Sequence, residues 1–141
     1  MILLDANLLL YAYDQESPKH QRAREILEGL LNSSDLVGLP WTSVWAFLRI
    51  ATHGQIFAAP MSPDEACEAV SSWCQCPNVR LLSPGERHWD HLQLLVQTGQ
   101  IRGALVMDAV LAAIAAEYGG EIWTSDRDFS RFEGIRWRNP L

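Results

Sequence analysis

Four aspartates occupy unusual places in the sequence, next to apolar residues instead of in polar turns. Asp5 interrupts the run "ILLDANLLL", and Asp108 lies within "ALVMDAVLAAIAA". Asp126 and Asp128 lie in "IWTSDRDF", after an apolar pair and two hydroxyl residues. Carboxylate oxygens suit Mg²⁺ and Mn²⁺, and such ions activate water and neutralise charge in phosphoryl chemistry. These four aspartates are therefore candidate ligands of Mg²⁺ or Mn²⁺.

Electrostatic repulsion gives the aspartates a reason to bind a cation if the fold brings them together. Two carboxylates about 4 Å apart repel by roughly 1 kcal/mol in water and roughly 4 kcal/mol at an effective dielectric of 20. Lysine does not offset this repulsion, because Lys19 is the only lysine and lies in another segment. The net charge of −6 disfavours nucleic acid as a partner. Much of that charge would, however, belong to the metal site itself.

Each aspartate, taken singly, also has an ordinary structural explanation. Asp5 would serve as a turn residue or a helix cap, and Asp108 would complement a helix dipole. Ser125 or Asp126 would cap a short helix that contains Phe129. These alternatives remain open for each residue, and only the joint occurrence of the aspartates favours a common site.

Short apolar segments alternate with helical patterns along the chain. We expect strands at 1–4, 36–39, 79–82 and 121–124, and a fifth at 135–137. We expect helices at 20–31, 42–52, 62–73, 86–96 and 107–118. This alternation predicts one domain over residues 1–141, a three-layer α/β/α sandwich with a short, mostly parallel central sheet.

The expected topology places the aspartates near one edge of the sheet. In open parallel sheets, ligands bind at the carboxyl ends of strands, near the point where strand order reverses. Asp5 follows the first strand, and Asp126 and Asp128 follow the fourth. Asp108 begins the helix that leads into the fourth strand. If the first and fourth strands are neighbours, the four carboxylates converge.

Composition and the terminal segment exclude several classes of protein. Hydrophobic residues make up 48% of the chain, which indicates a globular fold. The apolar N-terminus has no basic start and soon reaches Asp5, and the longest apolar stretch is too short to span a bilayer. We therefore expect a soluble cytoplasmic protein. The odd number of cysteines, with no further zinc ligands nearby, predicts reduced thiols.

Four segments together resemble the PIN-domain ribonucleases, in particular the VapC-type toxins of bacterial toxin–antitoxin pairs. They are "ILLDANLLLYAYD", "WTSVWAFLRIATHGQIF", "MDAVLAAIAAEYGGEIWTSDRDF" and "FEGIRWRNPL". Each is a weak signal, but their order and spacing run from one end of the chain to the other. The resemblance implies a PIN-like fold, a Mg²⁺- or Mn²⁺-dependent endoribonuclease and an RNA substrate. It also implies a cognate antitoxin that covers the acidic site, and a homodimer.

The resemblance also implies roles for individual residues. Asp5, Asp108 and Asp126 match the catalytic, metal-binding acids of the family. Asp128 matches the second acid of its T-x-D-x-D-F run and joins them as a metal ligand. The supporting polar residues are Asn7 and Thr124, with Ser125 beside them.

One position departs from the family pattern. Many relatives carry a glutamate in a helix with the pattern E-F-x-R, and this chain has "AFLR", with Ala46 at the place of the acid or Phe47 in another register. Either Asp128 and water complete the metal site, or metal affinity is low or activity is lost. If activity is weakened or lost, the protein is a module that binds antitoxin or RNA without cutting.

The expected RNA-binding residues are Arg49 and Arg127.

Two other enzyme classes place an aspartate after the first strand. An aspartate-nucleophile phosphatase needs a second aspartate two residues later, where this chain has Asn7. A phosphorylated receiver domain needs a lysine at the site, and Lys19 lies in the wrong segment. Both classes fit the sequence less well than a metal-dependent nuclease.

Overall fold

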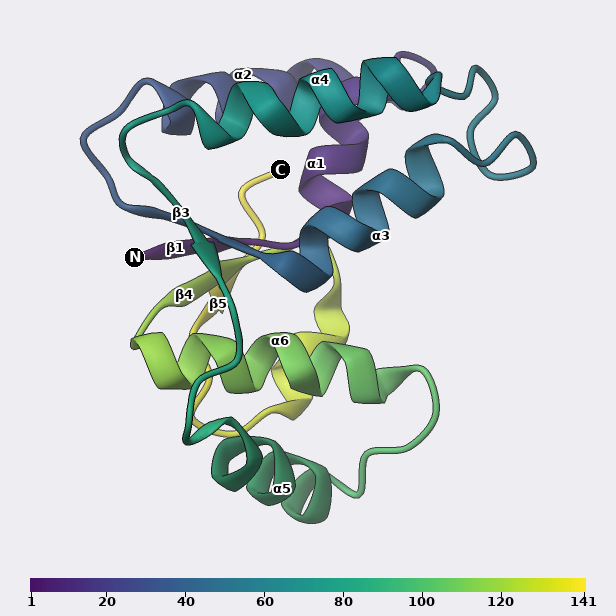
Figure 1. Cartoon of the computed structure of the whole chain (residues 1–141). Helices are drawn as coiled ribbons and strands as arrows, with labels where there is room; N and C mark the ends of the chain where they lie inside the picture. The colour runs from purple at the N-terminus through teal and green to yellow at the C-terminus, as the bar shows by residue number, and fades with distance from the viewer.

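The computed structural model describes all 141 residues as a five-stranded parallel sheet between two layers of helices (Figure 1). The strands are β1 Ile2–Leu4, β2 Val37–Pro40, β3 Val79–Leu82, β4 Glu121–Trp123 and β5 Trp137–Arg138. Their order is β3-β2-β1-β4-β5, and every neighbouring pair is parallel. The predicted three-layer architecture with a parallel sheet is confirmed.

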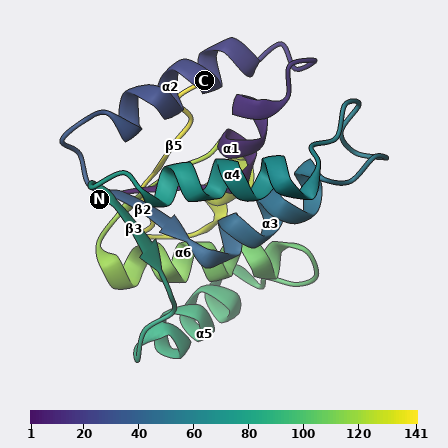
Figure 2. The same ribbon diagram turned by 45° about the horizontal axis from the view of Figure 1, so that its top comes forward.

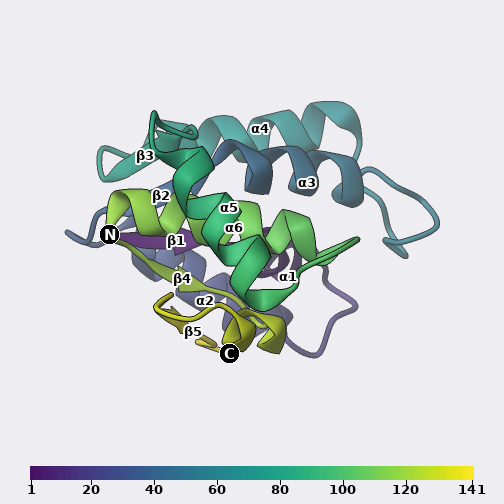
Figure 3. The same cartoon turned by 90° about the horizontal axis from the view of Figure 1, so that it is seen from below.

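Six α-helices and one short 3₁₀ helix connect the strands. They are α1 Ala6–Tyr13, α2 His20–Leu31, α3 Trp41–Ala51, α4 Pro63–Cys74, α5 His88–Gly99, α6 Leu105–Tyr118 and η1 Arg127–Arg131. Helices α1 to α4 cover one face of the sheet, and α5 and α6 cover the other. Figure 2 turns α2 and α4 toward the reader, and Figure 3 views the molecule from the side of α5 and α6. None of the helices is long and apolar enough to cross a membrane.

The sheet divides the hydrophobic core into two parts. Leu3 packs against α5 and α6, whereas Leu4 packs against α1 to α4, because consecutive strand residues point to opposite faces. On the α1–α4 side, the rings of Phe47 and Trp73 meet edge to face with centroids 4.8 Å apart. On the other side, Phe129 of η1 is fully buried. The sheet therefore separates two apolar clusters, one beneath each layer of helices.

The helix boundaries follow the local signals in the sequence. Ser62 and Glu65 form a reciprocal capping box at the start of α4, with Pro63 at its first position. Gly119 ends α6 in the left-handed conformation, with φ of 63°, which glycine adopts without a steric penalty. Most other boundaries differ from the expected ones by one to three residues.

Helix α1 was absent from the sequence-based prediction. Its sequence "ANLLLYAY" is apolar at nearly every position, and none of its eight residues is exposed. A helix that is covered on all sides has no polar face, so it lacks the periodic pattern by which a helix is recognised. Asp5 is the N-cap of this helix, which makes the ordinary structural explanation of Asp5 correct as far as it goes.

Candidate metal centre

Strands β1 and β4 are neighbours, and their pairing brings two acidic segments together. Leu4 pairs with Trp123, and the Asp5 backbone N–H donates to the Trp123 carbonyl oxygen over 3.1 Å. Asp5 and Thr124 therefore leave adjacent strands side by side. The expected neighbourhood of the first and fourth strands is confirmed.

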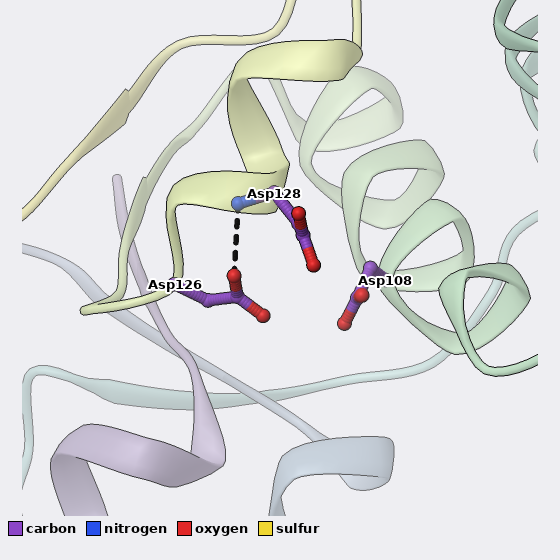
Figure 4. Close-up of side chains that lie close together, drawn as sticks. All are labelled: Asp108, Asp126 and Asp128. Atoms are coloured by element: carbon purple, nitrogen blue, oxygen red, sulfur yellow. Dashed lines mark hydrogen bonds between the residues drawn. The ribbon is translucent and has the colours of Figure 1, made fainter.

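Three carboxylates converge next to this edge of the sheet. Asp108, Asp126 and Asp128 each offer a carboxylate oxygen, and these oxygens lie within 4.8 Å of one another. Figure 4 shows Asp108 on α6 directed toward the segment that carries the other two. The Asp128 backbone N–H donates to Asp126 Oδ1 over 2.8 Å, so Asp126 also caps η1. We call these three residues the aspartate cluster.

Asp5 lies beside the aspartate cluster and is not part of it. Its Oδ1 accepts a hydrogen bond from the Ala6 backbone N–H over 2.7 Å. Its Oδ2 accepts from Thr124 Oγ1 over 2.7 Å and from Asn7 Nδ2 over 3.0 Å. Of the four predicted ligands, three lie close together in the aspartate cluster. The fourth, Asp5, lies next to them and is held in place by its hydrogen bonds.

Thr124 connects the two acidic segments through its side chain. It is fully buried, and its Oγ1 also accepts from Asn7 Nδ2 over 2.9 Å and from the Asp126 backbone N–H over 3.0 Å. Ser125 takes part through its backbone N–H, which donates to Asn7 Oδ1 over 3.3 Å. The contacts of Asn7 and Thr124 are those of residues that orient Asp5 and Asp126, whereas Ser125 contributes backbone only.

Replacing Thr124 with valine should lower the free energy of unfolding by about 1–3 kcal/mol, because buried partners lose their hydrogen bond at nearly unchanged volume. Thr124→Ser is the matched control, since it keeps the hydroxyl. Denaturant unfolding of both variants measures the difference. Equal free energies of unfolding for Thr124→Val and wild type would show that the hydrogen bonds of this hydroxyl do not stabilise the fold.

Burial, together with repulsion within the site, raises the pKa of two acids. Burial raises the pKa of Asp5 above its usual value. Burial, and then the charges of Asp126, Asp5 and Asp128, raise the pKa of Asp108 to about 6. Each shift means that the charged form is disfavoured without a counter-charge. An oxygen-rich cluster with this property fits a hard divalent cation such as Mg²⁺ or Mn²⁺.

Positive side chains near the cluster are arginines. Arg131 Nε lies 3.6 Å from Asp128 Oδ1, and both side chains are about half exposed, so solvent screens the pair. This ion pair was not predicted from the sequence. Lys19 instead packs over the ring of Tyr11, as expected for a lysine outside the site. Asp108 and Asp126 form no ion pair.

A cavity of about 170 Å³ adjoins the aspartate cluster. Asp5 and Asp108 line it together with the α3 residues Thr42, Ser43, Ala46 and Arg49. Position 46 therefore lines the same cavity as Asp5 and Asp108, whereas Phe47 is fully buried in the core. Arg49 is exposed and borders this cavity, whereas Arg127 lies exposed on η1 outside it.

Thr42 and Ser43 are candidate functional residues that the sequence reasoning missed. They lie in the first turn of α3, where hydroxyl residues are common as structural elements. The available signal was the spacing of Thr42, Ala46 and Arg49 at i, i+4 and i+7, which places all three on one helix face.

Comparison with known proteins identifies the family of this chain. The PIN domain family model matches residues 2–135. The chain is 40% identical to Ribonuclease VapC33 of Mycobacterium tuberculosis over 141 residues, covering 100% of this chain and 99% of that one. Ribonuclease VapC37 of the same organism is 39% identical, covering 99% and 97%. The structure of VapBC2 from Rickettsia felis bound to a promoter DNA fragment shares the fold, with a TM-score of 0.71 at 15% identity over 99% of this chain and 98% of that one. This chain belongs to the PIN domain family.

Proposed function

We propose that this protein is a metal-dependent endoribonuclease and the toxin of a type II toxin–antitoxin pair. The observation that carries the proposal is the aspartate cluster, whose three carboxylate oxygens lie within 4.8 Å of one another beside Asp5. Membership of the PIN domain family and the ribonuclease names of the relatives support it. Cleavage of RNA with added metal, and its loss with excess chelator, tests the proposal.

The proposed division of labour follows from the contacts. Asp108, Asp126 and Asp128 would hold Mg²⁺ or Mn²⁺, with Asp5 as a further acid at the cavity. When bound, the cation supplies an activated water and neutralises charge on the phosphate. Asn7 and Thr124 fix the orientation of Asp5 Oδ2, and the Asp128 backbone N–H fixes Asp126 Oδ1. These hydrogen bonds preorganise the acids, which limits the reorganisation needed during reaction.

A second candidate function is a module that binds antitoxin or RNA without cutting. Ala46 favours it, because this alanine lines the cavity next to Asp5 and Asp108 where the family pattern places an acid. Mg²⁺, however, tolerates the loss of a protein ligand because it readily keeps several waters. Metal-dependent cleavage by the wild-type protein separates the two functions.

Asp128 and Ala46 should have opposite effects on metal affinity. Asp128→Asn should weaken Mn²⁺ binding and cleavage nearly as much as Asp126→Asn, because Asp128 supplies one of only three clustered oxygens. Ala46→Glu should strengthen Mn²⁺ binding, because it adds a carboxylate to the cavity. Calorimetric titration of Mn²⁺ into wild type and variants measures both effects.

Trp45→Glu is a matched control for Ala46→Glu, since Trp45 is 61% exposed on the same helix and does not line the cavity. If Asp128→Asn binds Mn²⁺ and cleaves RNA as well as wild type does, Asp128 is only an acid in the first turn of η1 and not a metal ligand. Unchanged affinity in folded Ala46→Glu would mean that position 46 does not reach the cation.

We also propose that a cognate antitoxin covers the acidic site with a positively charged group. The surplus of carboxylates over cations in the aspartate cluster supports this, since only Asp128 has an ion-pair partner within the chain. A homodimer, which the resemblance implies, stays a prediction for which sedimentation of the purified protein is the direct measurement.

Neutralising two clustered acids should weaken antitoxin binding. Asp108→Asn/Asp126→Asn removes two charges from the proposed docking surface, and we expect the loss to grow at low salt, where charge pairs are least screened. Surface plasmon resonance with the antitoxin co-purified from its operon measures this. If the double variant and wild type bind the antitoxin equally tightly at every salt concentration, the antitoxin does not bind over the aspartate cluster.

A further inference from the structure

The α3 side of the cavity carries hydroxyls and an arginine, opposite in character to the acids across it. Thr42, Ala46 and Arg49 share one face of α3, and Ser43 lies beside them. All four line the same cavity as Asp5 and Asp108. We call these four residues the α3 wall.

One hydroxyl of the α3 wall lacks a partner within the chain, and the other lies beside it. Thr42 Oγ1 is inaccessible to solvent and makes no hydrogen bond. Ser43 is 3% exposed and lines the same cavity. A buried hydroxyl without a partner destabilises the fold. Such a group at Thr42, with the hydroxyl of Ser43 beside it on the same cavity, points to a ligand that accepts hydrogen bonds.

The start of α3 adds further donors to this wall. The helix has 11 residues, and its N-cap is Pro40, which provides no side-chain hydrogen bond to the first turn. First-turn N–H groups have no partner within a helix, and the dipole gives this end a partial positive charge. Arg49 adds a full positive charge at the same cavity. Donors and positive charge together suit a phosphate oxygen.

Ala46 leaves this side of the cavity open and uncharged. A glutamate there would occupy space between the hydroxyls and Arg49 and would repel an anion. With alanine, the acids lie on one side of the cavity and the donors on the other. A phosphate bridging a bound cation and the α3 wall would meet complementary charge on both sides.

We propose that the α3 wall binds a backbone phosphate of the RNA substrate, with Thr42, Ser43 and Arg49 as its hydrogen-bond donors. The inference rests on the proposed ribonuclease function and assigns the substrate contacts of the same site. Thr42 and Ser43 contact the phosphate in this arrangement, and they do not bind the cation.

Binding of an RNA that stays intact tests this inference without relying on catalysis. The probe is a short, fluorescein-labelled single-stranded RNA, titrated by anisotropy with Ca²⁺ in place of Mn²⁺, and gel electrophoresis checks that it is not cleaved. Thr42→Val/Ser43→Ala should bind it at least about tenfold more weakly, as should Arg49→Gln, since each loses hydrogen bonds to a charged group. Thr98→Val/Ser71→Ala, at exposed sites on α5 and α4, should bind like wild type.

Salt dependence separates the two kinds of donor. Arg49→Gln should reduce the slope of log affinity against log salt by about 0.7, the value for one phosphate contact on a single strand. Thr42→Val/Ser43→Ala should leave that slope and the Mn²⁺ affinity unchanged. Thr42→Val alone should raise the melting temperature, because it removes a buried hydroxyl without a partner. A weaker RNA affinity in a variant with this substitution would therefore not come from unfolding.

Wild-type RNA affinity in Thr42→Val/Ser43→Ala would overturn the inference and leave the ribonuclease proposal intact. Loss of Mn²⁺ affinity in that variant would also overturn it, since the hydroxyls would then serve the cation. A wild-type protein that binds no RNA would overturn both.

Discussion

Asp126→Asn is expected to lower RNA cleavage at least about 100-fold, since weaker changes around metal ligands already cost 10- to 100-fold. The substitution removes a charge from the aspartate cluster but keeps an oxygen that accepts from the Asp128 backbone N–H. The cap of η1 and the fold should therefore survive. Asp5→Asn and Asp108→Asn should also abolish cleavage, and single-turnover cleavage of labelled RNA with Mn²⁺ measures all three.

Asp90→Asn is the matched control, because Asp90 is an exposed acid in the first turn of α5, outside the cavity. It should cleave like wild type, and circular dichroism should show the same fold for every variant. Undiminished cleavage by any of the three site variants would remove that residue from the catalytic set.

Acidification should release the metal and stabilise the metal-free protein. The pKa of Asp108 is raised from 3.8 to about 6 in the fold, so the folded chain binds a proton more readily than the unfolded chain. This contribution to stability is fully present below about pH 4 and is lost as the pH rises through 6. Mn²⁺ affinity should fall about tenfold at about pH 5, because only about one tenth of Asp108 is then ionised.

Asp108→Asn separates this titration from other acids of the protein. The variant should be more stable than wild type at neutral pH in chelator, since it removes a carboxylate that faces three others. Its stability should change less between pH 5 and 7 than that of wild type, as followed by thermal melts. A metal-free wild type that loses stability on acidification through pH 6 would contradict the repulsion inferred at Asp108.

The fold was predictable because its signals are local and repeated. Alternating strands and helices imply a parallel sheet, and the acids at strand ends imply a common edge. Helix α1 was not predictable by pattern, because no face of it is exposed. Without helix α1, the sequence shows Asp5 as an acid within an apolar run. In the structure, Asp5 is also the N-cap of that helix.

The details of the candidate site depend on geometry that spacing does not contain. The separation of Asp5 from the aspartate cluster follows from its hydrogen bonds to Thr124 and Asn7. The pair of Arg131 with Asp128 arises from one turn of η1, a helix of only five residues. The hydroxyls of Thr42 and Ser43 become notable only when the cavity shows what they face.

This protein should cleave RNA with a divalent cation that its clustered carboxylates hold. The most direct measurement is cleavage of one labelled RNA by wild type with Mg²⁺ or Mn²⁺, with excess chelator, and after the metal is restored, with Asp126→Asn assayed in parallel. We expect cleavage only in the two metal-containing wild-type reactions. Cleavage that persists in excess chelator would contradict the metal mechanism, and no cleavage under any condition would favour the binding module.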